Sequence, residues 1–539
     1  MPKSQPARGS LYFMEPVQEP LPRGVQPCRR RIITMCGLML VMLVAKAQAS
    51  GPPLIAVSVK TAPLGRQIPP HFVGMSMEVS TAGQALAPPP KPLQLVTHLH
   101  AKGQFVYSLG VPGDPNQGYF QFMRNLGPAL LRLGGNSQDN TCWDMASAPH
   151  PKFCNAPLTA GDFQLWSAAA RATGWHLILG INLKQDAPQW ALKEITQGVS
   201  RYMQPSEIKA LEIGNEPSLF PRDGSRPRSY SPQDQVHDFM AYARAFAANP
   251  VPKKFALAGP AACCSWENTK DLDIFMEGAR HSNLRLVTVH EYVTTTCGGR
   301  TVSIPQLLAP ETTERFIRRA RRWVVAAHAH GLPMALAETN STSCGGMTGV
   351  SNAFASAVWG LDYMFQVARD GFSSINFHSS YKTGGSAYNP IVTLGTKQGH
   401  GRWHYNNIAE PLYYAMYMFA RNAEGNHLLP VSVSTHANVR AYAVSACTRC
   451  AVRVFLINKD LAASGEARVS VAGHKAPATL LLLRAPSLSS SAGGVRYGGA
   501  QFNSEGRIAP PHTTTVRPNA QGEYVFTLPN ASAALLTIQ

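Results

Sequence analysis

Hydrophobic positions follow a repeating order along the chain from about residue 70. Short runs of aliphatic or β-branched residues alternate with longer stretches in which apolar residues recur at helical spacing. This alternation predicts β-strands followed by α-helices, the arrangement of a parallel sheet. Eight strand-like runs are present, at residues 72–76, 129–135, 176–183, 210–216, 254–261, 285–292, 334–340 and 374–380.

The stretches between those runs predict helices, for example at 162–173, 234–248, 311–330 and 352–369. Eight strands with interleaved helices indicate an α/β protein built on a (β/α)8 TIM barrel. A doubly wound open sheet would instead carry a glycine-rich phosphate-binding turn after its first strand, and the sequence has no such turn there.

The pattern changes after about residue 425 to short alternating segments separated by turn residues. These segments fall at 431–434, 439–445, 452–458, 467–472, 479–483 and 524–527. They predict a C-terminal antiparallel β-sandwich, and residues 54–60, which alternate in the same way, are expected to add a strand to it. We therefore expect an export signal at 1–49, an N-terminal strand at 50–68, the barrel at 69–422 and the β-sandwich at 423–539.

The first 49 residues have the three-part pattern of a cleavable export signal. Three arginines at 29–31 precede an apolar run at 32–45, and Ala47-Gln48-Ala49 follows it. We expect cleavage after Ala49 and a secreted or periplasmic mature protein. The alternative is a membrane anchor, but the apolar run is shorter than the roughly 20 residues that span a bilayer.

Charge changes this picture little. The chain has a formal net charge of +18, with 45% hydrophobic and 15% charged residues, a composition typical of a folded protein. Residues 1–49 carry seven basic and two acidic side chains, so loss of the signal leaves +13. Such a charge steers polyanions towards a protein, although a solvated basic face is the simpler interpretation. No nucleic-acid-binding motif accompanies it, so a nucleic-acid partner is not expected.

Eight cysteines remain after the signal, because Cys28 and Cys36 are removed with it. An even number in an exported protein favours disulfides over metal ligation. A zinc site is not expected, since Cys447-Thr-Arg-Cys450 has no second such pair.

Carboxylates at strand ends are the candidate catalytic groups, because barrel active sites lie at the C-terminal ends of the strands. Five acids qualify: Glu78, Asp139, Glu216, Glu291 and Glu338. The fourth and seventh strands lie on roughly opposite sides of the ring, so Glu216 and Glu338 are expected to face each other. Two carboxyl groups about 5 to 5.5 Å apart suit a retaining glycosidase. The alternative for each is a structural glutamate paired with a barrel arginine.

Period-two alternation sorts the neighbouring residues. His290 and Tyr292 fall on one side of the sixth strand and Glu291 on the other. We expect Tyr292 to hold an oxygen of the nucleophile and His290 to line the sugar site. Glu291 is expected to contact the helix layer or a loop, and Glu212, deeper in the barrel than Glu216, to be a structural buried acid.

Five segments of the sequence resemble glycoside hydrolase family 79, the group that contains β-glucuronidases and heparanases. They are LRLGG at 131–135, IGNEP at 213–217, HEY at 290–292, AETNSTSCGG at 337–346 and NFHSSY at 376–381. The resemblance covers most of the mature chain. The Asn-Glu-Pro sequence marks the clan, and the glycine pair is the more discriminating feature.

The resemblance implies Glu216 as the general acid/base and Glu338 as the nucleophile. It also implies that Gly345, Gly346 and Tyr381 cradle the glucuronate carboxylate, with Tyr388 as the alternative tyrosine. The other interpretation of the glycine pair is that it merely turns the chain. Asn215 is expected to contact the sugar 2-hydroxyl, and Glu78 to bind ring hydroxyls.

The sequence departs from the heparanase type in two places. Only about twenty residues, 136–158, lie where that type has a long excised segment, so a latent proenzyme is not expected. The spacing from Glu338 to Gly345 is one residue longer, which bears on the carboxylate cradle. The segment 80–117 is expected to shape the cleft.

Disulfides follow from this placement. Cys297 and Cys344 lie after adjacent strands, where a bridge would fix the glycine pair. We also expect Cys142 to pair with Cys154 and Cys447 with Cys450. The vicinal Cys263 and Cys264 remain unassigned.

The function expected from sequence is a cofactor-free and metal-free β-glucuronidase that acts on glucuronic-acid-containing oligosaccharides or polysaccharides. Exo and endo heparanase-like action both remain open. The alternatives are another two-glutamate retaining glycosidase (a xylanase, β-galactosidase or arabinofuranosidase) and a non-catalytic polysaccharide-binding protein. No membrane partner is expected after signal cleavage, and the oligomeric state is not specified.

Overall fold

The computed structural model describes residues 53–86, 115–143, 151–381, 386–397 and 403–539. The export signal and most of the segment 80–117 lie outside the described residues. Within the described part of the chain, no helix is both long and apolar enough to cross a membrane.

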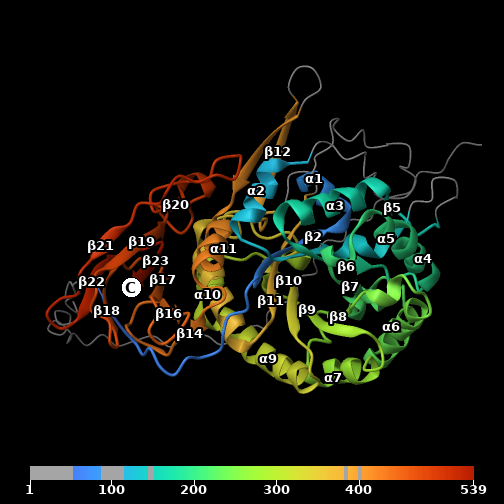
Figure 1. The fold of residues 1–539 in the computed structure, drawn as a ribbon, viewed down its shortest axis with the longest axis horizontal. Coiled ribbons are helices and arrows are strands. Elements are labelled where there is room, and N and C mark those ends of the chain that lie inside the picture. Colours follow the sequence, from blue (N-terminus) through green and yellow to red (C-terminus); the bar gives the residue numbers. More distant parts are fainter. Residues whose placement is uncertain (1–52, 87–114, 144–150, 382–385, 398–402) are drawn as a thin grey trace, which may run out of the picture. The chain divides into compact units, whose positions relative to one another are not determined.

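Residues 73–379 form a closed barrel in which every neighbouring pair of strands is parallel (Figure 1). In chain order its eight strands are β2 (Val73–Glu78), β3 (Leu130–Gly134), β6 (His176–Ile181), β7 (Ile208–Ile213), β8 (Leu257–Ala262), β9 (Leu284–Thr295), β10 (Met334–Ser343) and β11 (Ser374–Ser379). Each overlaps one of the eight runs predicted from sequence, and the (β/α)8 fold is confirmed.

Helices cover the outside of the barrel, as Figure 1 shows for α6, α7 and α9. The longer ones are α2 (Gln117–Asn125), α3 (Ala160–Thr173), α6 (Pro232–Ala247), α7 (Thr269–Gly278), α9 (Pro310–Ala329), α10 (Phe354–Asp370) and α11 (Pro411–Asn422). Capping explains where α6 begins: Ser231 and Asp234 hydrogen-bond each other's backbone N–H, and Pro232 occupies the first turn. All but one residue of α10 is buried, which agrees with its apolar composition.

Two sheets form the C-terminal region. The first has the order β15 (Val431–Ser434), β1 (Leu54–Val59), β18 (Gly465–Val471) and β22 (Glu523–Leu528). β1 pairs antiparallel with β15 and parallel with β18, so residues 54–60 do join this region as expected. The second sheet has β17 (Val452–Asn458) and β19 (Ala478–Arg484) on either side of β23 (Ser532–Ile538), with β16 (Val439–Ser445) beyond β17.

Of the strands that the hydrophobic pattern did not predict, the longest belong to two features. β23 reads SAALLTI and is buried almost throughout, so it shows no alternation between apolar and polar positions. The second feature is a hairpin inserted after the last barrel strand, formed by β12 (Ile391–Lys397) and β13 (Trp403–Ala409).

The barrel and the C-terminal sheets share a buried ionic contact. Lys459 Nζ lies 2.5 Å from Asp362 Oδ2 on α10, and the Tyr442 hydroxyl donates to Asp362 Oδ1 at 2.6 Å. Both charged side chains are at most 1% exposed. The positive charge of Lys459 and these hydrogen bonds hold the pKa of Asp362 below its usual value, although burial acts to raise it.

Four disulfides are present, and three are the pairs expected: Cys142–Cys154, Cys297–Cys344 and Cys447–Cys450. The fourth joins the vicinal Cys263 and Cys264, which the sequence left unassigned.

Candidate active site

Glu216 and Glu338 converge at one end of the barrel. Glu216 follows β7 and has a left-handed backbone conformation (φ 49°), with its N–H donating to Ala261 O. Glu338 lies within β10. One carboxylate oxygen of each, together with a ring nitrogen of His290, lies within 4.8 Å of the other two. This separation suits a carboxylate pair that works on opposite faces of one bond, as in retaining glycosidases.

Glu338 is the more constrained of the two glutamates. Tyr292 donates to its Oε1 at 2.9 Å, and Arg132 donates to its Oε2 at 2.6 Å. Burial acts to raise the pKa of Glu338, but the charges of His378, His290 and Arg132 and the Tyr292 hydrogen bond hold it well below its usual value. Burial and the Glu338 charge raise the pKa of Tyr292, so its hydroxyl keeps its proton. Glu338 is therefore an ionised carboxylate with both oxygens fixed.

Glu216 has a looser environment. His290 Nδ1 lies 3.2 Å from its Oε1, and its side chain is 15% exposed, compared with 9% for Glu338. His290 and Tyr292 both face this site from β9. Glu291, between them, instead pairs with Arg319 on α9 at 3.0 Å, which confirms the alternation predicted from sequence.

Arg132 on β3 is a central residue of the site that was not predicted from sequence. Its fully buried guanidinium donates to Glu212 at 2.5 Å, Glu338 at 2.6 Å and Asn215 at 2.9 Å. Burial alone would lower the pKa of Arg132, but the two carboxylates raise it, so it stays charged. The quoted LRLGG segment contains this residue, and an arginine in an otherwise apolar barrel strand was the available signal. Glu212 is the buried structural acid expected.

His378, a second residue that was not predicted from sequence, links Glu78 to this network. His378 on β11 lies 3.6 Å from Glu338 Oε2 and 3.8 Å from Glu78 Oε1, while Ser76 contacts its Nδ1 at 3.0 Å. Burial lowers the pKa of His378, but the Glu338 and Glu78 carboxylates raise it above its usual value. Hydrogen bonds from His378 and Ser137 outweigh burial and lower the pKa of Glu78. The structure thus groups Glu78 with the catalytic candidates.

Asn215 is also brought into the site. Its Oδ1 accepts from Arg132, and its side-chain amide lies 3.4 Å from Asn136 Oδ1. Its side chain is therefore oriented from two sides beside Glu216.

The glycine pair follows β10 directly. Gly345 and Gly346 have φ values of 91° and 82°, which favour glycine, and Gly345 O accepts from Ala387 N at 2.8 Å. A Cβ atom on Gly346 would lie 2.8 Å from Tyr388 N. Within the described ranges, neither glycine N–H donates to another group. The close packing places the pair against the segment that carries Tyr388.

Tyr388, not Tyr381, is the tyrosine that lies with the site residues. Its ring packs 6.1 Å from that of Tyr292 and 6.0 Å from that of His378. The Tyr381 hydroxyl is instead committed elsewhere, at 2.9 Å from Ile391 O and 2.8 Å from the Tyr119 hydroxyl. Burial raises the pKa of Tyr388, and the Glu338 and Glu78 charges raise it further, so it remains a hydrogen-bond donor.

The oxygen and nitrogen atoms of Glu216, His290 and Glu338 also have the spacing of metal ligands. Arg132, however, already places a positive charge 2.6 Å from Glu338. A metal ion there would meet like charge, so the arrangement suits proton and glycosyl transfer better.

Comparison with known proteins shows which family the chain resembles. Residues 441–535 match the model of the glycosyl hydrolase family 79 C-terminal beta domain. A β-glucuronidase of Aspergillus niger is 23% identical over 349 residues, which cover 60% of this chain and 63% of that protein. A heparanase of Gallus gallus is 25% identical over 260 residues, or 47% of each chain. The matches thus span less than two thirds of either relative.

The fold has a counterpart among solved structures. A 4-O-α-L-rhamnosyl-β-D-glucuronidase from Fusarium oxysporum 12S superposes with a TM-score of 0.68 at 18% identity, over 89% of this chain and 100% of that one. At this identity the likeness shows the fold alone. The domain match and the curated resemblances agree with each other, and the chain resembles glycosyl hydrolase family 79, whose C-terminal beta domain matches residues 441–535.

Proposed function

We propose that the protein is a retaining glycoside hydrolase that cleaves β-linked glucuronic acid from glycans or glycoconjugates. The observation that carries this proposal is the pair of carboxylate oxygens of Glu216 and Glu338 within 4.8 Å of each other. Inverting enzymes need a wider gap, about 6.5 to 9.5 Å, to hold a water molecule between sugar and base.

Glu338 is the nucleophile in this proposal. Its carboxylate attacks the anomeric carbon while the bond from that carbon to the leaving oxygen breaks, which gives a covalent glycosyl-enzyme. Tyr292 and Arg132, at 2.9 and 2.6 Å, keep the attacking group ionised and oriented. A carboxylate held below its usual pKa is available as a nucleophile at neutral pH.

Glu216 is the general acid and then the general base. It gives its proton to the leaving oxygen in the first step. In the second step it takes a proton from the water that attacks the anomeric carbon, and the bond from that carbon to Glu338 breaks. His290, 3.2 Å from its Oε1, positions the carboxyl group in both protonation states. The greater exposure of the Glu216 side chain, 15%, agrees with contact to water in the second step.

The preference for glucuronic acid rests on the glycine pair and Tyr388. The N–H groups of Gly345 and Gly346 have no acceptor in the described part of the chain, and backbone N–H groups bind anions without adding a full charge. A carboxylate held there also accepts from the Tyr388 phenol. Asn215 and Glu78 would contact ring hydroxyls. The names of the two curated relatives, β-glucuronidase and heparanase, favour the same substrate class.

Replacement of each glutamate tests the proposal. Glu338→Ala and Glu216→Ala are expected to lower turnover of an aryl β-glucuronide by at least a thousandfold. Glu291→Ala, which removes an acid from the other face of β9, is the matched control and is expected to stay within about threefold of wild type. Near wild-type turnover in both glutamate variants would contradict the assignment.

A panel of aryl glycosides separates this function from its alternatives. The uronide is expected to exceed the matching β-glucoside in kcat/KM, because only the uronide carries the carboxylate for the glycine pair. Higher activity on an arabinofuranoside, xyloside or galactoside would favour another two-glutamate hydrolase. Product sizes from a glucuronate-containing polysaccharide would then distinguish exo from endo action.

A further inference from the structure

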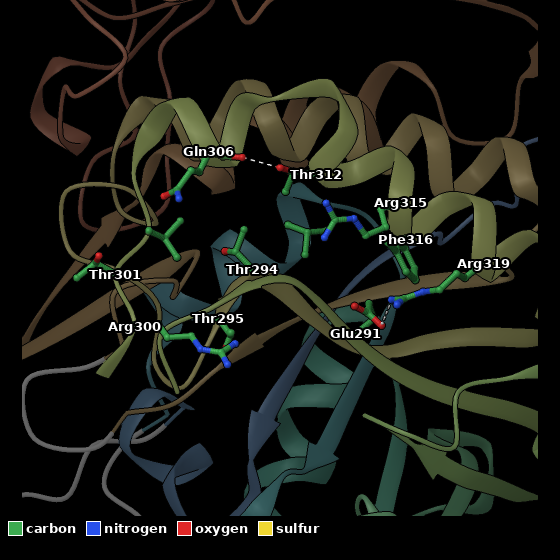
Figure 2. Close-up of a pocket in the computed structure, with 12 residues that line it drawn as sticks. Glu291, Thr294, Thr295, Arg300, Thr301, Gln306, Thr312, Arg315, Phe316 and Arg319 are labelled. Atoms are coloured by element: carbon green, nitrogen blue, oxygen red, sulfur yellow. Dashed lines mark hydrogen bonds and ion pairs between the residues drawn. The ribbon is translucent and has the colours of Figure 1, made fainter. Parts of the chain in front are cut away.

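A cavity of about 470 Å³ lies between the end of β9 and the helix α9, and neither Glu216 nor Glu338 lines it (Figure 2). One wall is the end of β9, with Glu291, Thr294 and Thr295. The other walls are the 300–302 loop, α8 (Ile304–Leu308) and α9. In Figure 2, Thr312 and Arg315 on α9 lie across the cavity from Thr294 on the strand. This site takes no part in the chemistry proposed above.

Three guanidinium groups line this cavity. Arg319 is paired with Glu291 at 3.0 Å. Arg300 and Arg315, both exposed, have no ion pair or hydrogen bond to any other described residue. Like charges around one cavity repel each other, and a bound anion relieves that repulsion. The cavity therefore has two cationic side chains available to an anion.

Neutral hydrogen-bond donors accompany these charges. Gln306 Oε1 already accepts from the backbone and hydroxyl of Ser303, which leaves the Gln306 side-chain NH2 free to donate. The exposed Thr301 hydroxyl has no partner among the described residues. Both residues line the cavity, so donors of both charged and neutral type face the same space.

The cavity also has an apolar side and a size that exceeds a simple ion. Val293, Val302 and Phe316 line it beside the polar groups, and Phe316 is buried. Its volume, about 470 Å³, is more than ten times the roughly 30 Å³ that one water molecule occupies. A tetrahedral inorganic anion would leave most of it unfilled. A sugar ring offers C–H faces to the apolar side and anionic substituents to the arginines.

We propose that this cavity is a second saccharide-binding site, which takes an anionic sugar unit through Arg300, Arg315 and Gln306. The ligand carries sulfate or carboxylate groups, since both accept planar or forked hydrogen bonds from guanidinium. The site shares β9 with Tyr292, which does not line the cavity. The disulfide Cys297–Cys344 ties the loop that carries Arg300 to the end of β10.

A sulfated maltotriose is the probe that tests this site, because it lacks glucuronate and so does not depend on the proposed catalytic function. Its binding is measured by calorimetry at fixed, moderate salt. The test variant is Arg300→Gln/Arg315→Gln. The control is Arg318→Gln/Arg322→Gln, which removes the same charge from exposed positions of α9 that do not line the cavity.

The test variant is expected to bind at least tenfold more weakly than wild type, and the control to stay within about twofold. Unsulfated maltotriose is expected to bind at least tenfold more weakly than the sulfated form. Hydrolysis of a small aryl β-glucuronide should be unchanged in the test variant and under saturation with the probe, which separates this site from the catalytic proposal.

Three results would overturn the inference. Equal weakening in both double variants would show that only the general positive charge attracts the probe. No weakening in either would place the probe elsewhere. If inorganic sulfate bound through Arg300 and Arg315 as tightly as the sulfated sugar, the cavity would be an anion site with no preference for a sugar.

Discussion

Arg132 and Glu338 lie 2.6 Å apart inside the barrel, and the same guanidinium also holds Glu212 at 2.5 Å. The arginine thus pairs with two carboxylates that have different roles. Glu212 is fully buried, whereas Glu338 is the candidate nucleophile. Because one cation offsets both charges, the stability of the barrel and the ionisation of the nucleophile are coupled through it.

Loss of this arginine is expected to destabilise the protein. Arg132→Gln leaves Glu212 buried without a cationic partner and Glu338 with only the neighbouring histidines, so the free energy of unfolding at pH 7 should fall by about 3 to 5 kcal/mol. Chemical denaturation measures the change. The exposed Arg322→Gln, expected to change it by less than about 0.5 kcal/mol, is the control. A loss below about 1 kcal/mol for Arg132→Gln would contradict the coupling.

Tyr292→Phe removes the hydrogen bond to Glu338 Oε1. Hydrogen bonds to charged groups contribute about 1.5 to 3 kcal/mol, so kcat/KM on an aryl glucuronide should fall roughly tenfold to a hundredfold. Because that bond lowers the pKa of Glu338, the acid limb of the pH profile should move to higher pH. Tyr202→Phe, at a tyrosine packed on Trp143, is the control. An unmoved acid limb would count against Tyr292 as the residue that keeps Glu338 ionised.

Two tyrosines near the end of β11 should behave differently. Tyr388→Phe is expected to reduce the ratio of uronide to glucoside kcat/KM by roughly tenfold, because a donor to the carboxylate is lost. Tyr381→Phe should leave that ratio unchanged. It should instead lower the free energy of unfolding by about 1 to 3 kcal/mol, since Ile391 O loses its buried donor. The opposite pattern would indicate that Tyr381, and not Tyr388, binds the glucuronate carboxylate.

The stability of the protein should depend on pH through Glu338 and His378. The folded-state pKa of Glu338 is below its ordinary 4.5, so its contribution is complete above pH 4.5 and is lost as the pH falls further. The pKa of His378 is above its ordinary 6.5, so its contribution is complete below pH 6.5 and is lost as the pH rises through the higher value.

Glu338→Gln tests both effects in one series of urea denaturations across this pH range. The loss of stability at low pH that is attributed to Glu338 should disappear. The loss of stability at high pH should become smaller, because His378 no longer has the Glu338 charge beside it. Stability curves for wild type and variant that run parallel from pH 3 to pH 9 would show that neither group is responsible.

The Cys297–Cys344 disulfide closes a loop with a sequence separation of 47. Its removal in Cys297→Ser/Cys344→Ser should cost about 4 kcal/mol of unfolding free energy on the chain-entropy estimate. It should also raise KM for the uronide, because Gly345 follows the bridge directly. Removal of Cys447–Cys450, with a separation of 3, should cost less and leave KM unchanged. If removal of either disulfide changed KM equally, the Cys297–Cys344 bridge would have no specific role in holding the carboxylate-binding glycine pair.

Sequence periodicity was sufficient to predict the barrel and the residues that share one face of β9. Barrel strands are short apolar runs with helices between them, so each strand stood out. His290 and Tyr292 could be placed together because side chains alternate along a strand. The β23 strand escaped prediction because both of its faces are buried and the alternation disappears.

The finer details of the site depend on tertiary contacts that no local pattern encodes. Arg132 meets Glu212 and Glu338 across the barrel, far apart in sequence, and an isolated arginine in a strand does not indicate two partners. The choice between Tyr381 and Tyr388 depends on the path of the chain between them. That path is fixed by contacts such as Ala387 N to Gly345 O, not by composition.

The pairing of β1 with β15 and β18 has a consequence for biosynthesis. Ile55, Val57 and Val59 are translated early, yet their strand partners leave the ribosome only after the whole barrel. During that interval the apolar face of β1 has no sheet to join. Contacts between such distant parts of a sequence form slowly. Until they form, the apolar surface of the strand stays exposed and is prone to aggregation. The C-terminal sheets therefore complete last, and chaperone demand during synthesis should centre on this first strand.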